Sequence, residues 1–193
     1  MRLNVDTCYI KHKEKRVCQG DIFRDIKYNL STEIKDNAIV VNEMTIPYLI
    51  ILSQECDLDW DFKYRSDIKY DTHDKYLQSI LVSPAYLAEK VKEGTHLEDL
   101  QLKMQSYTSR KWSDIKSNQN IRYHYLQDED RLKIPELVID FKHYYTIPRD
   151  FFYKEFFGNY VGTLDQMFRE HLSQRFAHYL SRIGLPMITT AEK

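Results

Sequence analysis

Pro47-Tyr48-Leu49-Ile50-Ile51-Leu52-Ser53 contains the longest uninterrupted apolar run of the chain, from Tyr48 to Leu52. A short continuous run with β-branched residues is typical of a fully buried strand. Pro47 stands at the start of the run, where a strand tolerates a residue without an N–H donor. The segment therefore predicts a central strand of a sheet.

Further strand signals surround this run. Gly20-Asp21-Ile22-Phe23 opens one strand, and the turn residues Asp36-Asn37 precede another at Ala38-Ile39-Val40-Val41. A long polar loop is expected from Asp57 to Lys75, and the next strand from Tyr76 to Val82. The first half of the chain thus reads as mostly β.

Helix signals interrupt the strands after residue 82. Ser83-Pro84 has the pattern of an N-cap followed by proline at the first helical position, and Gly94 marks the end of that helix. Thr95-His96-Leu97-Glu98 is a capping box that predicts a second helix. We therefore expect a two-helix insertion over residues 84–116, whose second helix has an apolar face formed by Leu97, Leu100 and Met104.

Strands resume at Ile121 to Leu126, and a hairpin with Leu137 to Tyr145 is expected. Apolar residues then recur at every fourth position from Leu164 to Leu180, which predicts an amphipathic helix over residues 163–183 that stops at Gly184. This helix is expected to cross one face of a small barrel or to pair with a second copy of the chain.

The composition is that of one globular domain spanning residues 1–193. Hydrophobic residues make up 42% of the chain, and 28 basic against 29 acidic residues give a net charge of −1. These values exclude a disordered tail and a histone-like basic binder. Three widely spaced cysteines, Cys8, Cys18 and Cys56, indicate reduced thiols. Without a signal-peptide run or a membrane-spanning apolar window, the expected location is cytoplasmic, with no membrane contact.

Two of the motifs resemble the PemK/MazF-like family. Gly20-Asp21-Ile22 is similar to the family's first strand, and the run from Pro47 to Ser53 is similar to its second motif, in the same order. Ile46 stands where family toxins usually carry arginine. Endoribonuclease toxins of toxin–antitoxin pairs are the characterised members, so the resemblance implies RNA binding and cleavage, in active or degenerate form. The segment from Ser53 to Leu58 is also similar to bacterial proteins of this barrel type found in phage defence.

The fold that the resemblance implies is an SH3-like, strongly bent β-barrel with a C-terminal helix. Combined with the strand and helix signals, this gives a mostly β (α+β) fold. Its barrel strands are expected over residues 20–82 and 121–161, with the insertion over 84–116 and the terminal helix over 163–183.

RNA cleavage needs a proton acceptor and a cation beside the phosphate. Arg24 is the catalytic arginine that the resemblance implies, and Ser53 would position the nucleotide. His124 is the candidate acceptor, because its unperturbed pKa lies near 6.5. The catalytic set expected is therefore Arg24, Ser53 and His124.

Substrate contacts are expected from Arg122, Asp57 and Tyr123. Arg122 and His124 alternate with Tyr123 and Tyr125, so the basic pair should share one exposed face of a strand. The alternative is a half-buried strand whose tyrosines fill the core, with Ser53 and Asp57 bonding the backbone of a turn.

The flank of the terminal helix carries His171, Arg175, His178 and Arg182 along one line. This line is interpreted as a phosphate track, as a surface for an acidic partner, or as an ordinary solvated face. His171 and His178 are two turns apart, about 10 Å along the axis, so they do not share one metal ion.

Two other functions are consistent with the sequence. One is a non-enzymatic SH3-like interaction module of a defence or regulatory complex, which binds a partner protein or a second copy through the terminal helix. The other is a hydrolase with Cys56 as nucleophile, His124 as base and Asp140 as orienting group. No metal-ligand spacing stands out, and no metal or cofactor is expected.

Overall fold

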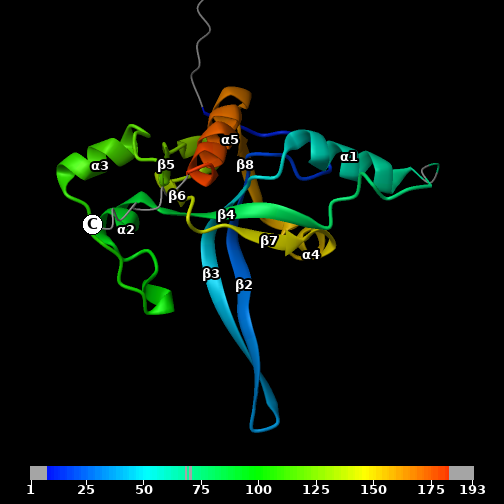
Figure 1. Cartoon of the computed structure of the whole chain (residues 1–193), viewed down its shortest axis with the longest axis horizontal. Coiled ribbons are helices and arrows are strands. Elements are labelled where there is room, and N and C mark those ends of the chain that lie inside the picture. Colours follow the sequence, from blue (N-terminus) through cyan, green and yellow to red (C-terminus); the bar gives the residue numbers. More distant parts are fainter. Residues whose placement is uncertain (1–7, 68, 70, 183–193) are drawn as a thin grey trace, which may run out of the picture.

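The computed structural model describes residues 8–67, 69 and 71–182. It is an α+β structure built on one curled, half-barrel antiparallel sheet, in which the strand path runs β1-β8-β2-β3-β4-β6-β5 and β7 pairs with β4 (Figure 1). The strands are β1 (Tyr9–Ile10), β2 (Asp21–Lys35), β3 (Ala38–Ile51), β4 (Ser79–Leu87), β5 (Tyr123–Leu126), β6 (Leu137–Asp140), β7 (Tyr145–Pro148) and β8 (Tyr160–Leu164).

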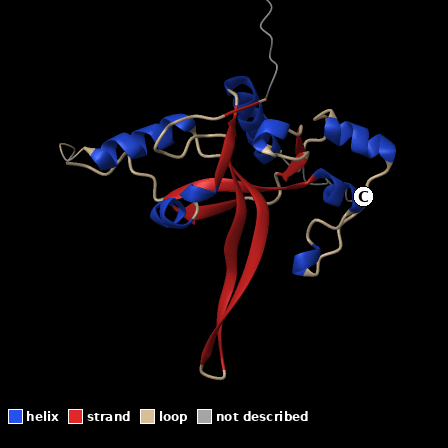
Figure 2. Ribbon diagram, turned by 180° about the vertical axis from the view of Figure 1, so that it is seen from behind, coloured by secondary structure: helices blue, strands red, loops and turns tan. Residues whose placement is uncertain are grey.

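The helices are placed around this sheet (Figure 2). The α-helices are α1 (Glu55–Ser66), α2 (Ala88–Glu93), α3 (Ser109–Lys116), α4 (Arg149–Glu155) and α5 (Gln166–Leu180), and the short 3₁₀ turns are η1 (Glu98–Leu100), η2 (Asp130–Leu132) and η3 (Phe157–Asn159). Among the described helices, none combines the length and apolar character needed to cross a membrane.

The predicted central strand is confirmed as the end of β3. Leu49, Ile50 and Ile51 are fully buried, with β2 on one side and β4 on the other. Ile50 packs in the core beneath α5, whereas Leu49 and Ile51 pack in a second core that includes Phe152 of α4. The continuous apolar run exists because alternate residues fill two different cores.

Strands β2 and β3 form a hairpin that projects well beyond the rest of the sheet (Figures 1 and 2). The expected turn at Asp36-Asn37 is confirmed, and both residues have positive φ, 51° and 61°. A two-residue turn of this type matches the twist of the strands it joins. The strands expected separately at Ala38–Val41 and after Pro47 are one continuous strand, because β3 pairs with β2 along its length before it reaches β4.

The prediction that a helix starts at Ser83-Pro84 is wrong, because both residues lie within β4. Pro84 is tolerated there because the neighbour of β4 changes at this point, from β7 up to Val82 to β6 from Ala85. The Ser83 hydroxyl donates to the His143 carbonyl oxygen at 2.7 Å. The helix begins only at α2, and Gly94 ends it as predicted, with φ 79°.

The capping box at Thr95 does not start a long helix. Only the single turn η1 forms, and the chain becomes helical again in α3. The insertion therefore consists of α2, η1 and α3, and it packs a third core in which Val91 of α2 and Ile115 of α3 meet Tyr86 of β4.

The prediction of a long loop from Asp57 to Lys75 is also wrong, because α1 occupies the first half of this range. Acidic residues in the first turn and basic residues in the last favour this helix through the helix dipole. Lys63 and Arg65 pair with Asp59 and Asp61, each four residues earlier, at 2.6 Å. The sequence carries these charge pairs but no apolar stripe to reveal the helix.

The predicted terminal helix is confirmed as α5, with a later start than expected because Leu164 belongs to β8. Leu172 and Phe176 are buried against the sheet, with Phe168 and Tyr179 beside them. The middle of the apolar stripe is therefore covered by this chain's own core, whereas Leu180 at its end is 51% exposed. The expected stop at Gly184 lies outside the described residues.

Candidate functional site

The structure separates the three predicted catalytic residues. Arg24 is exposed in β2, opposite Tyr48 of β3. The Ser53 hydroxyl accepts a hydrogen bond from the Leu81 backbone N–H at 2.8 Å, which ties the end of β3 to β4. His124 lies in β5. Across the described part of the chain, no recorded contact joins any two of Arg24, Ser53 and His124.

The prediction that Arg122 and His124 share an exposed face is wrong for His124, while Arg122 is half-buried. His124 is only 3% exposed and faces His171 of α5, with ring centroids 5.4 Å apart. Tyr123 is buried as well, and its hydroxyl bonds that of Tyr107 at 2.7 Å. Both faces of β5 are covered, one by α5 and the other by the insertion. The alternation in the sequence therefore does not distinguish a solvent-exposed face from a buried one.

Arg122 is half-buried and is paired with the buried Asp140. Its Nε and Nη2 donate to the two carboxylate oxygens at 2.8 and 2.5 Å, and Asp140 is 1% exposed. The Lys142 backbone N–H donates to the same carboxylate at 3.0 Å, and His143 Nδ1 lies 3.6 Å away. The guanidinium that was expected to bind phosphate is thus occupied by an internal carboxylate.

The hydrolase arrangement does not form. Cys56 is exposed on α1, and its thiol lies 3.7 Å from the carboxylate of the adjacent Asp57. Figure 1 shows α1 and β5 on opposite sides of the molecule. Asp140 accepts hydrogen bonds from Arg122 rather than from His124. His124 lies opposite Ile139 where β5 pairs with β6. The three residues of the hydrolase hypothesis therefore have separate structural roles.

The flank of α5 is not a free phosphate track. Arg175 donates to the backbone carbonyl oxygens of Asn118, Asn120 and Tyr123, the latter two at 2.6 and 2.7 Å. Its guanidinium thereby anchors the segment before β5 to the helix. Arg182 bonds the Tyr179 carbonyl oxygen at 2.9 Å within the helix end.

One cluster of metal-type ligands is present that the sequence analysis missed. Ligand atoms of His12, Cys18 and Asp21 lie within 4.8 Å of one another. His12 Nε2 is 2.8 Å from Asp21, whereas its Nδ1 accepts from the Glu14 backbone N–H at 3.2 Å. Nε2 therefore carries the ring proton and donates it to Asp21, and burial raises the pKa of the Cys18 thiol to about 12. This arrangement favours a structural hydrogen-bond network over a cation site.

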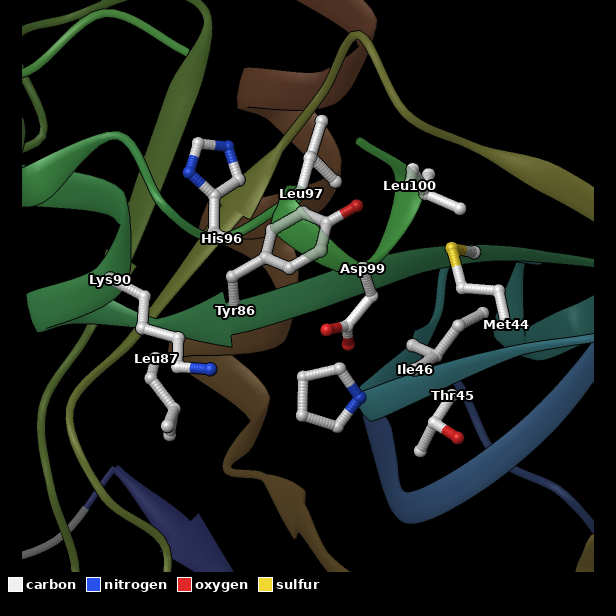
Figure 3. Close-up of a pocket in the computed structure, with 11 residues that line it drawn as sticks. Met44, Thr45, Ile46, Tyr86, Leu87, Lys90, His96, Leu97, Asp99 and Leu100 are labelled. Carbon is white, nitrogen blue, oxygen red and sulfur yellow. The ribbon is translucent and has the colours of Figure 1, made fainter. Parts of the chain in front are cut away.

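A cavity of about 150 Å³ opens between the base of the hairpin, β4 and the insertion (Figure 3). Its walls come from three segments, residues 44–47 of β3, residues 86–90 at the junction of β4 and α2, and residues 96–100 around η1. Most of the lining is apolar, and the polar side chains come from Thr45, Tyr86, Lys90, His96 and Asp99.

Three titratable groups in and behind the cavity wall, those of Tyr86, His96 and His143, are uncharged near pH 7. The Tyr86 hydroxyl lies 3.2 Å from His143 Nδ1, which links the cavity wall to the Asp140 cluster. Burial lowers the pKa of His96 and of His143 from their ordinary values, and it raises that of Tyr86. All three groups are therefore neutral near pH 7, and fixed charge enters only through Lys90 and Asp99.

The second unusual surface is the outer part of the β2–β3 hairpin, residues 29–43, here called the arm. None of these residues is buried. Large apolar side chains are exposed along the arm: Leu30 by 44%, Ile34 by 78%, Ile39 by 72% and Val41 by 45%. This surface was not predicted from the sequence, although apolar residues on both sides of Asp36-Asn37 are a visible signal of a hairpin with an apolar face.

No family model matches the sequence, and no curated protein matches it significantly. The architecture thus defines the class of protein, an α+β chain with one curled antiparallel sheet.

Proposed function

We propose that the protein is a non-enzymatic interaction module that binds a partner protein through the arm. The observation that carries this proposal is the apolar face of the arm. Ile34 lies directly opposite Ile39, and Thr32 lies opposite Val41, so these four side chains share one face of the hairpin.

The arm has no core of its own to cover that face. A two-stranded hairpin is marginally stable alone in water, and contiguous exposed apolar surface commonly marks an interaction site. Beyond Phe23 no described residue pairs with the outer edge of β2, and before Tyr48 none pairs with that of β3. A partner could therefore add a strand to either edge as well as cover the apolar face.

The charge of the arm indicates the kind of partner. Residues 29–43 contain one lysine, Lys35, against three acidic residues, Glu33, Asp36 and Glu43. A surface that binds nucleic-acid phosphates needs clustered basic residues. The arm instead suits a protein surface with an apolar centre and a basic rim.

The test is the double substitution of Ile34→Thr and Ile39→Thr, which keeps β-branched side chains but removes apolar surface. We expect partner affinity to fall at least about 10-fold, because two central apolar contacts are lost. The melting temperature should not change, since neither side chain is buried. The affinity is measured by titrating the partner protein, and the melting temperature by thermal unfolding.

Asn42→Thr, on the opposite face of the arm, is the matched control and should bind like the wild type. Sedimentation over a range of protein concentrations identifies a second copy of the chain as the partner, if that is what the arm binds. Equal partner affinity for the double variant and the control would refute the role of the apolar face.

RNA binding of the PemK/MazF-like kind, on a curled sheet of SH3-like type, is the second candidate function. It is favoured by Arg24, whose exposed side chain is the cross-strand neighbour of Tyr48. A cation beside an aromatic ring is a common RNA-contacting pair.

We expect salt-dependent binding or cleavage of mixed single-stranded RNA to be lost in Arg24→Ala and kept in Arg110→Ala, an exposed arginine on α3. The measurement is a gel assay of RNA integrity together with binding at two salt concentrations. Intact and unbound RNA at high protein concentration would end this candidate.

A further inference from the structure

The cavity beside β4 has an apolar interior that reaches into the body of the protein. Met44, Ile46 and Leu97 line it and are 6%, 1% and 5% exposed, so their side chains form a fixed floor. Apolar cavities of about 150 Å³ hold a molecule the size of benzene. This one therefore has room for a branched aliphatic or single-ring group.

Two opposite charges stand at the rim of the cavity. Lys90 extends from α2 and Asp99 from η1, and Figure 3 shows both side chains pointing into the cavity and toward one another. Both residues are exposed. Among the described residues, neither Lys90 nor Asp99 takes part in any recorded ion pair, although the two carry opposite charge. They are therefore available to pair with charges of a ligand.

The polar side chains deeper in the cavity bring no charge of their own. Tyr86 is bonded to His143, and His96 is neutral near pH 7 for the reason given above. A ligand that fits this pattern has a neutral apolar body and carries an anionic and a cationic group side by side at one end.

We propose that the cavity binds a free α-amino acid with a large apolar side chain, of the leucine or phenylalanine class. The side chain would occupy the floor formed by Met44, Ile46 and Leu97. The carboxylate would pair with Lys90, and the ammonium with Asp99. The proposal is independent of the arm, which lies on the outer part of the hairpin.

Calorimetric titration with L-leucine and two single-charge analogues tests the assignment. The analogues are isoamylamine, which has only the ammonium, and 4-methylpentanoate, which has only the carboxylate. We expect L-leucine to bind most tightly. Lys90→Met should weaken L-leucine and 4-methylpentanoate about 5-fold each and leave isoamylamine unchanged, and Asp99→Asn should do the converse.

Lys92→Met and Glu98→Gln are the matched controls, because they remove neighbouring exposed charges that do not line this cavity. Both controls should bind L-leucine like the wild type. The proposal is overturned if L-leucine and L-phenylalanine show no binding at millimolar concentration, or if the rim variants bind as the controls do. Equal binding of N-acetyl-leucine amide would also overturn it, and would identify the cavity as a socket for a partner's side chain.

Discussion

Replacing Arg122 with leucine is expected to lower the free energy of unfolding by about 3–5 kcal/mol. The substitution leaves the Asp140 carboxylate, which is 1% exposed, without its bidentate partner. The remaining partners, the Lys142 backbone N–H and His143, do not replace a guanidinium. For a chain of this length the melting temperature should fall by roughly 10 °C, which thermal and urea unfolding measure directly.

A double-mutant cycle separates the ion pair from the packing around it. The double variant Arg122→Leu with Asp140→Leu should recover much of the loss, because paired apolar replacements of a buried ion pair are often neutral. Arg122→Lys should be intermediate, since lysine has no planar fork. Arg131→Leu, which breaks the exposed pair with Glu129, is the control and should unfold like the wild type. An Arg122→Leu variant as stable as the control would contradict the buried pair.

The parts of the fold that the sequence predicts are those with strong local chemistry. The central strand, the turn at Asp36-Asn37, the stop at Gly94 and the amphipathic helix α5 each carry a periodic or conformational signal that needs no tertiary context. These elements establish an α+β protein with a central β-sheet and a covering terminal helix.

The errors arise where tertiary contacts override local signals. Ser83-Pro84 is a good helix start by itself, but it lies in β4 at the point where the neighbouring strand changes. α1 has little amphipathic pattern, and its buried Asp61 is stabilised by Arg65 and by Arg149, which is far away in sequence. Local pattern cannot reveal a partner that the chain supplies many residues later.

The candidate site shows the same limit. Alternation along residues 122–125 separates Arg122 and His124 from the tyrosines, but it does not show that α5 and the insertion cover both faces of β5. An aspartate at the end of the apolar run of β6 was a usable signal, because a buried carboxylate requires a cation nearby. Arg122, in the segment just before β5, was a possible partner. The charges at the cavity rim, Lys90 and Asp99, have no such signature.

Lowering the pH from 7 to 5 is expected to destabilise the fold by about 2 kcal/mol through His124 alone. Burial, reinforced by Arg175 and His171, lowers the pKa of His124 to about 3. In the unfolded chain the imidazole titrates near its ordinary pKa of about 6.5. Between pH 6.5 and pH 3, His124 is protonated in the unfolded chain but stays neutral in the folded chain. The free energy of unfolding therefore decreases as the pH falls from 6.5 toward 3.

The measurement compares the pH dependence of urea unfolding in the wild type, in His124→Gln and in His178→Gln. His178 is exposed on the same helix that covers His124. The loss between pH 7 and pH 5 should be smaller in His124→Gln than in the wild type by about 2 kcal/mol, whatever the substitution does to stability at pH 7. His178→Gln should follow the wild type. Identical pH profiles for all three proteins would mean that His124 binds a proton as easily in the folded state as in the unfolded one. That result would return the residue to the role of an accessible proton acceptor, the role the RNA-cleaving candidate requires.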